Sequence, residues 1–93
     1  MENIKVAIWG FGAMGSGVAK VLLRKKGVDI TGVCDIHPAR VGKSIFEVLG
    51  VERGERADVL VSPDIEAVVS KEKCDICIIA TDSFTAKVLW KRV

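Results

Sequence analysis

Residues 4–17 read IKVAIWGFGAMGSG, an apolar run that passes at once into a glycine-rich turn. The run from Ile4 to Trp9 is short, apolar and stopped by a glycine, which is typical of a buried strand. Behind the glycines, apolar residues recur at helical spacing as far as a basic segment at residues 24–26 and then Gly27, the usual signs of a helix C-terminus. This part of the chain therefore predicts a strand, a tight turn and a helix.

The rest of the chain continues the alternation of strand and helix. Further strands are predicted at residues 30–34, 58–61 and 75–80, and short helices at residues 44–49 and 65–69. A last helix is predicted from Thr85 onward, with Ser83 or Thr85 as its N-cap. Strands separated by helices are typical of right-handed βαβ units. We therefore expect a Rossmann-type, doubly wound α/β fold: a parallel sheet of strand order 3-2-1-4 between helices, in three layers.

Composition and charge narrow the class of protein. The 93 residues are 49% hydrophobic and 28% charged, which is typical of a globular domain and excludes a disordered chain. Lys and Arg (14) nearly balance Asp and Glu (12), so a nucleic-acid-binding surface is not expected. No apolar run approaches the roughly 18 residues of a membrane span, and no signal-peptide pattern is present. Together with an odd number of cysteines (3), these features predict a cytoplasmic protein.

Gly10, Gly12 and Gly15 form the pattern G-x-G-x-x-G between the first predicted strand and its helix. In this context the first glycine permits a tight turn, the second lets the backbone approach a pyrophosphate, and the third lets the helix pack closely on the sheet. Asp35 follows the second strand about twenty residues later, where a carboxylate accepts hydrogen bonds from ribose hydroxyls. We expect a dinucleotide site; the alternative is that the glycines only make a turn and Asp35 only caps a loop.

Two further features bear on the bound dinucleotide. Asp35 favours NAD, since the 2′-phosphate of NADP would meet a like charge, but Arg40 and Lys43 follow within the same loop and can pair with that phosphate. The residues therefore leave two alternatives, use of both NAD and NADP or use of NAD alone. At the end of the fourth strand, Ala80 and Thr81 are small enough for the ribose and nicotinamide side of the cofactor to approach, unless they only form a strand-to-helix turn.

Other residues that carry chemistry have simpler interpretations. Cys74 and Cys77 form a nominal C-x-x-C, but no second pair exists, so buried cysteines are favoured over a redox or zinc site. Cys34 is interpreted in the same way. His37 is interpreted as a loop residue near the adenine side rather than a catalytic base, and Trp9 as part of the core. No catalytic residue and no metal ligand is predicted in this chain.

Three segments carry a family resemblance: IKVAIWGFGAMGSG at residues 4–17, GVCDIHPARVGKSIFEVLG at residues 32–50, and DICIIATDSF at residues 75–84. Together they resemble the amino-terminal part of the dihydrodipicolinate reductase-like dehydrogenases, and the resemblance covers essentially the whole chain. True dihydrodipicolinate reductases usually begin with a G-x-x-G-x-M-G turn. The different turn of this chain argues against tetrahydrodipicolinate synthesis as its activity.

The resemblance implies site residues and an activity. The implied pyrophosphate site consists of Gly10, Phe11, Gly12, Ala13, Met14 and Gly15. Asp35 and Arg40 are implied to hold the adenosine ribose, and Ala80 with Thr81 the nicotinamide half. The implied reaction, within this group of dehydrogenases, is oxidative deamination of 2,4-diaminopentanoate to 2-amino-4-oxopentanoate and ammonia, with NAD or NADP as the hydride acceptor.

The resemblance also implies a domain organisation. Family members carry a second, carboxyl-terminal domain that binds the small-molecule substrate and builds a homo-oligomer. Residues 1–93 are then the N-terminal NAD(P)-binding domain, cut before the substrate domain, and we expect no turnover from them alone. A non-catalytic dinucleotide-sensing domain would share the same motifs. A partner-binding module is the other alternative, although the glycine turn would have no purpose in it.

Overall fold

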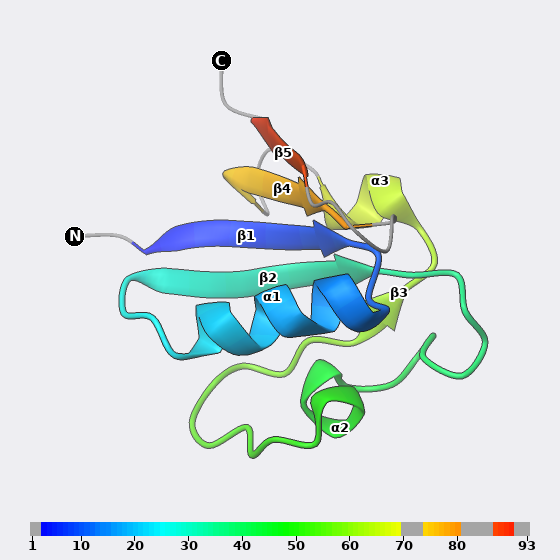
Figure 1. Ribbon diagram of the computed structural model, residues 1–93, viewed down its shortest axis with the longest axis horizontal. Coiled ribbons are helices and arrows are strands. Elements are labelled where there is room, and N and C mark those ends of the chain that lie inside the picture. The colour runs from blue at the N-terminus through cyan, green and yellow to red at the C-terminus, as the bar shows by residue number, and fades with distance from the viewer. Residues whose placement is uncertain (1–2, 70–73, 81–86, 91–93) are drawn as a thin grey trace.

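The computed structural model describes residues 3–69, 74–80 and 87–90. Its elements, in chain order, are β1 (Ile4–Trp9), α1 (Ala13–Leu23), β2 (Val28–Cys34), α2 (Ile45–Leu49), β3 (Val61–Ser62), α3 (Ile65–Val68), β4 (Ile76–Ile79) and β5 (Lys87–Trp90). The strands form a five-stranded sheet in the order β3-β2-β1-β4-β5 (Figure 1). Strands β3, β2, β1 and β4 are parallel. The predicted α/β fold of Rossmann type and the parallel order 3-2-1-4 are therefore confirmed.

The helices cover both faces of the sheet. Successive side chains of a strand point to opposite faces. Val6 and Ile8 of β1 accordingly enter a core that they share with α1 and α2, whereas Ala7 enters a second core that it shares with α3. The three predicted layers, helix, sheet and helix, are thus present.

Side-chain caps determine where the short helices begin. The Ser44 hydroxyl accepts a hydrogen bond from the N–H of Phe46 (3.2 Å) at the start of α2. The Asp64 carboxylate accepts one from the N–H of Glu66 (3.0 Å) at the start of α3. Capping of this kind stabilises a helix by about 1 kcal/mol. Because α2 and α3 have five and four residues, they depend on these caps and on core packing rather than on helix propensity.

Two predicted elements differ in the structure. The strand predicted at residues 58–61 is limited to β3, because the residues before Val61 pair with the segment at Ser44 instead. Leu60 forms an isolated antiparallel bridge with Ser44, and the Asp58 carboxylate accepts hydrogen bonds from the Ser44 hydroxyl (2.6 Å) and the Val59 N–H (2.9 Å). The helix predicted from Thr85 is wrong at residues 87–90, which form β5 and pair antiparallel with β4. Its sequence, KVLW, contains residues favoured in strands, and pairing covers an otherwise open edge of the sheet. Ser83 and Thr85 lie outside the described residues.

Candidate functional site

The turn after β1 lies between the carboxyl ends of β2 and β4. The N–H of Gly10 donates to the carbonyl of Cys34 at the end of β2 (2.7 Å), and the N–H of Ala80 donates to the carbonyl of Trp9 at the end of β1 (2.7 Å). The residues predicted to bind a dinucleotide are thus brought to one edge of the sheet. This is the edge, at the reversal of strand order, where open α/β sheets bind their ligands. Thr81 lies outside the described residues.

The three glycines of the turn have different surroundings. Gly10 has φ +101°, a conformation that residues with a Cβ rarely adopt. At Gly15 an added Cβ would lie 1.8 Å from the carbonyl oxygen of Gly10, so only glycine lets α1 approach the end of β1 this closely. At Gly12 an added Cβ would meet nothing within 4 Å. The space in front of Gly12 is therefore open on the side of the helix start.

The start of α1 leaves its first N–H groups available. Gly12 is the N-cap and contributes no side-chain hydrogen bond, and the first turn of the helix contains no acidic residue. Ala13 is exposed and Met14 is half-buried. The first N–H groups of a helix have no partner within the helix, and its dipole is positive at this end. The turn and the helix start can accordingly hold an anion such as a pyrophosphate.

Phe11 anchors the turn in two ways. Its side chain is fully buried in the core beneath α1, and its backbone N–H donates to Oδ2 of Asp35 (2.8 Å). The Ser16 hydroxyl donates to the carbonyl of Phe11 (3.0 Å) and ties the turn to the first turns of α1. Ser16 was missed by the sequence analysis, because a serine inside a glycine-rich helix start gives no signal of this contact.

Asp35 accepts several hydrogen bonds at the end of β2. In addition to the bond from Phe11, Oδ1 accepts one from the N–H of His37 (2.9 Å), and Oδ2 forms an ion pair with Nη1 of Arg40 (3.1 Å). Burial by itself raises the pKa of Asp35, but the N–H groups of His37 and Phe11 and the guanidinium of Arg40 outweigh it, so the pKa lies below its usual value. The carboxylate therefore stays charged beside the glycine turn.

Two neighbours of Asp35 complete this end of the site. Ile36 directly follows it and is 81% exposed, an unusual position for an isoleucine. The sequence analysis missed Ile36, because only its exposure, and not its residue type, singles it out. The Nδ1 atom of His37 accepts a hydrogen bond from the N–H of Ala39 (3.1 Å), so this ring nitrogen is engaged in its own loop.

The cysteine side chains lie on the α3 face of the sheet. Cys34, Cys74 and Cys77 are buried in one apolar cluster, as the sequence predicts. Burial raises the pKa of the Cys34 thiol, and the carboxylates of Asp35 and Asp64 raise it further. The part of the chain that the structure describes contains no group of three His, Cys, Asp or Glu residues that could hold a metal ion.

The fold and the site define a dinucleotide-binding domain of the kind found in oxidoreductases. Residues 4–92 match a family described as the oxidoreductase family with an NAD-binding Rossmann fold, and the chain belongs to this family. The predicted cofactor class, a nicotinamide dinucleotide, agrees with that description. Among the helices that the structure describes, none is long and apolar enough to cross a membrane.

Two proteins of known name are similar to this chain. The chain is 42% identical over 91 residues to 2,4-diaminopentanoate dehydrogenase of Acetoanaerobium sticklandii, covering 98% of this chain and 25% of that protein. It is similar in structure to amine dehydrogenase from Mycobacterium smegmatis, with a TM-score of 0.69 and 37% identity, covering 82% of this chain and 22% of that one. The resemblance found in the sequence is thus confirmed. The chain spans about a quarter of the length of the curated relative that it matches.

Proposed function

We propose that this chain is the cofactor-binding part of a dehydrogenase that deaminates 2,4-diaminopentanoate oxidatively to 2-amino-4-oxopentanoate and ammonia. The observation that carries the proposal is the arrangement at one sheet edge, where the open space at Gly12, the start of α1 and the carboxylate of Asp35 lie together. The 42% identity to 2,4-diaminopentanoate dehydrogenase supports the substrate. In this proposal residues 1–93 are an N-terminal binding domain, and the groups that act on the substrate lie elsewhere in the protein.

The pyrophosphate is proposed to lie over Gly12. An added Cβ there would meet nothing within 4 Å, so the space fits a ligand that approaches the backbone closely. The N–H groups at the start of α1 are oriented for its oxygens, and the helix dipole favours their charge. Gly10, Phe11, Ala13, Met14 and Gly15 complete the turn around it.

The adenosine ribose is proposed to lie against Asp35. The N–H donors of Phe11 and His37 to this carboxylate belong to fixed turns of the backbone, whereas Arg40 reaches it with a side chain that is 31% exposed. A ribose hydroxyl that needs an acceptor at Asp35 therefore competes first with Arg40. With NADP, the released guanidinium can pair with the 2′-phosphate and offset its repulsion from Asp35. Arg40 thus lets the site accept both NAD and NADP.

The two bases of the dinucleotide are proposed to lie at opposite ends of this edge. Ile36 offers an exposed apolar side chain directly beside Asp35, which suits the face of an adenine ring. Ala80, small and buried, follows β4 and is proposed to lie on the nicotinamide side. Thr81, the next residue in the sequence, is proposed to act with it. When bound, the nicotinamide supplies the hydride acceptor for oxidation of the amine carbon. The residues of this chain bind the cofactor and orient it toward the substrate.

Titration with NADH and NADPH tests the cofactor site. Trp9 adjoins the glycine turn and is 37% exposed, so its interpretation as a core residue is wrong. The chain has 2 tryptophans, and a Trp90→Phe background leaves Trp9 as the only one. We expect its fluorescence to change on addition of either nucleotide. Gly12→Ala is the matched control: it has room for its Cβ, so the fold should be kept, while the methyl group should weaken binding about tenfold or more, a loss of about 1.4 kcal/mol. No response of the folded parent chain to millimolar nucleotide would refute the site.

Turnover tests the substrate separately. The protein that contains this chain should reduce NAD or NADP with 2,4-diaminopentanoate and release ammonia. A protein that oxidises other amines but not this one would refute the substrate and leave the cofactor site intact. A protein that binds the dinucleotide and oxidises no amine would indicate the sensing domain that the motifs also allow.

A further inference from the structure

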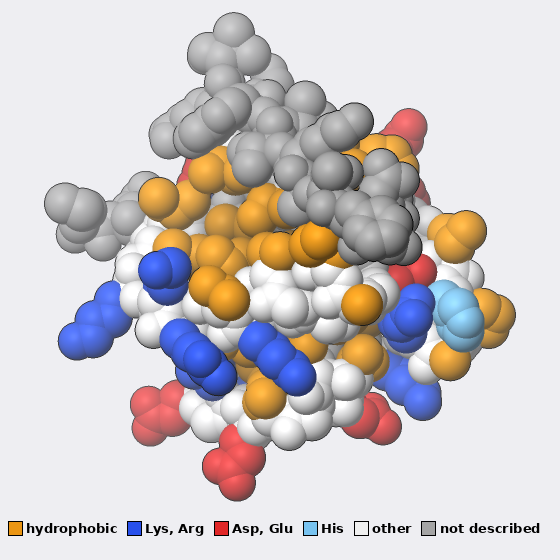
Figure 2. Space-filling view, viewed as in Figure 1, with side chains coloured by type: hydrophobic (Ala, Val, Ile, Leu, Met, Phe, Trp, Pro, Cys, Tyr) orange, Lys and Arg blue, Asp and Glu red, His pale blue; other side chains and the backbone are white. Residues whose placement is uncertain are grey.

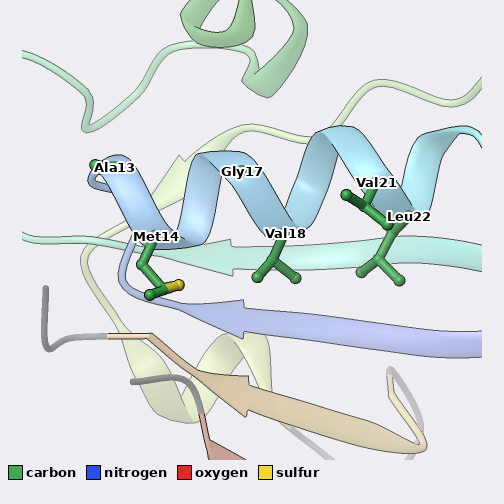
Figure 3. A pocket seen from close by; sticks show the side chains of 6 residues that line it. All are labelled: Ala13, Met14, Gly17, Val18, Val21 and Leu22. Atoms are coloured by element: carbon green, nitrogen blue, oxygen red, sulfur yellow. The ribbon is translucent and has the colours of Figure 1, made fainter. Parts of the chain in front are cut away.

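An apolar groove starts beside the glycine turn and runs along α1. It has a volume of about 490 Å³ and is lined by Ala13, Met14, Gly17, Val18, Val21 and Leu22. In Figure 3, Met14, Val18 and Leu22 point from the helix toward β1. Val21, at the far end of the groove, is 53% exposed, and it lies about two helical turns from the glycine turn. Most of the groove is therefore separate from the proposed cofactor site.

The groove continues onto an apolar part of the sheet. Ile76 and Ile78 of β4 pair in register with Val6 and Ile8 of β1, so all four side chains lie on the α1 face. Val6 and Ile8 are buried beneath α1, but Ile76 and Ile78 are only half-buried. Figure 2 shows hydrophobic side chains gathered over β1 and β4 on this face. Among the described residues, no helix packs over β4 here, so Ile76 and Ile78 keep part of their apolar surface accessible beside the groove.

Gly17 has no side chain to narrow the groove. It lies inside α1, where glycine is less favourable than alanine by about 1 kcal/mol. An added Cβ would meet nothing within 4 Å, so packing within the described chain gives no reason for a glycine. Together with Ala13, one turn earlier, it lets another backbone come close to the helix.

We propose that this groove is the docking site of an amphipathic helix from the part of the protein that follows residue 93. This chain spans 25% of 2,4-diaminopentanoate dehydrogenase and 22% of the amine dehydrogenase, so the greater part of each relative is available to supply such a segment. A segment of the same polypeptide also docks at a high effective concentration, without the full cost of bringing two molecules together.

The charges beside the groove define the chemistry of this helix. Lys20 of α1 and Arg24, the C-cap of this helix, are both exposed, and the sequence of α1, AMGSGVAKVLL, contains no acidic residue. Two copies that met through this face would bring like charges opposite each other, because a symmetric interface repeats the same patch. A helix with an apolar face and carboxylates along its edge would instead pair with Lys20 and Arg24. The docking helix is therefore acidic at its edge.

Cysteine labelling tests the docking in the protein expressed with the residues that follow position 93 in its gene. Val21→Cys lies in the groove and Leu60→Cys lies outside it, at parent exposures of 53% and 57%. We expect a maleimide to label Val21→Cys at least tenfold more slowly than Leu60→Cys in the native protein, and both at the same rate in urea. The unsubstituted protein, with its buried cysteines, gives the background rate.

Three outcomes would overturn the proposal. Equal native rates at the two positions would mean that the groove is open. Protection that disappears on dilution, together with a doubled mass, would assign the groove to a second copy. A reading frame that stops at residue 93 would leave no segment to dock. Labelling is done without dinucleotide, so its outcome does not depend on the proposed function.

A second pair of variants measures the same contact through folding. In the longer protein, Val21→Glu would place a carboxylate beneath the docked helix, and we expect it to lower the urea midpoint by about 1 M more than Leu60→Glu does. Equal midpoints for the two variants would also overturn the proposal.

Discussion

Gly15 and Gly17 stand two residues apart on α1, yet alanine should have opposite effects at the two positions. At Gly15 the new Cβ would lie 1.8 Å from the carbonyl oxygen of Gly10 and 2.8 Å from its carbon. Both neighbours are backbone atoms, so no side-chain rotation relieves the contact, and the start of α1 must move from β1 by more than about 1 Å to reach van der Waals distance. At Gly17 the new Cβ meets nothing within 4 Å.

The size of each effect follows from these contacts. Overpacking of a rigid site costs about 3 kcal/mol, of which the better helix propensity of alanine recovers about 1 kcal/mol. Gly15→Ala should therefore lower the free energy of unfolding by about 2 kcal/mol, whereas Gly17→Ala should raise it by about 1 kcal/mol. At about 4–8 °C for each kcal/mol in a domain of this size, the two melting temperatures should differ by roughly 12–24 °C.

Circular dichroism of the 93-residue chain, followed through thermal and urea unfolding, measures this difference without any ligand. The parent chain is the reference for both variants. Dinucleotide titration is a second readout: Gly15→Ala moves the N–H groups at the start of α1 and should weaken binding, while Gly17→Ala should leave binding unchanged. Equal melting temperatures for the two variants, or a Gly15→Ala variant more stable than the parent, would show that the close approach of α1 to Gly10 is not what requires this glycine.

Three further predictions concern charged groups and a thiol. Arg40→Ala should weaken NADP binding about tenfold, because the guanidinium that pairs with the 2′-phosphate is lost. NAD binding should stay unchanged or become slightly tighter, because Arg40 no longer competes with the ribose for Asp35. Calorimetric titration measures both affinities, and equal losses for the two nucleotides would contradict the prediction. The pKa of Asp35 lies below its ordinary value of 3.8, so the carboxylate stabilises the folded chain fully above about pH 4, and this contribution is lost as the pH falls through the lower folded value. Asp35→Asn should therefore lose less stability than the parent between about pH 5 and pH 2 in acid unfolding followed by circular dichroism, and superimposable curves would exclude this role. Burial raises the pKa of Cys34, and the carboxylates of Asp35 and Asp64 raise it further. In the folded chain this thiol should therefore react with iodoacetamide at pH 7 much more slowly than the thiol of free cysteine. Rapid alkylation located at Cys34 by mass spectrometry would be inconsistent with the buried site.

The first strand, turn and helix could be predicted from the sequence because their causes are local. Gly10 makes the turn by its own backbone conformation, and the apolar run before it has the length of one strand. The last segment could not be predicted in the same way. Residues 87–90 contain no turn signal of their own, and their strand conformation depends on pairing with β4, a contact that helical spacing does not reveal.

In the candidate site, too, the locally determined features could be predicted from the sequence and the long-range contacts could not. The residue types at Gly10, Gly12, Gly15 and Asp35 indicate a dinucleotide site, because each acts through its own backbone or charge. The hydrogen bond from Phe11 to Asp35 joins residues 24 positions apart, and it exists only after β1 and β2 have paired. The exposure of Ile36 likewise depends on how the loop after β2 lies on the finished fold. Such features require the structure.

The bond between the Phe11 N–H and Asp35 also has a consequence for protein engineering. A change of preference toward NADP calls for replacement of the acidic residue at the end of the second strand, because its charge repels the 2′-phosphate. In this chain the same carboxylate is the acceptor that holds the glycine turn. A replacement at Asp35 that carries no hydrogen-bond acceptor would therefore loosen the pyrophosphate site while it alters the ribose site. A useful NADP-selective design should supply a new acceptor for the Phe11 N–H at the same time, for example through a hydroxyl or amide oxygen at position 35.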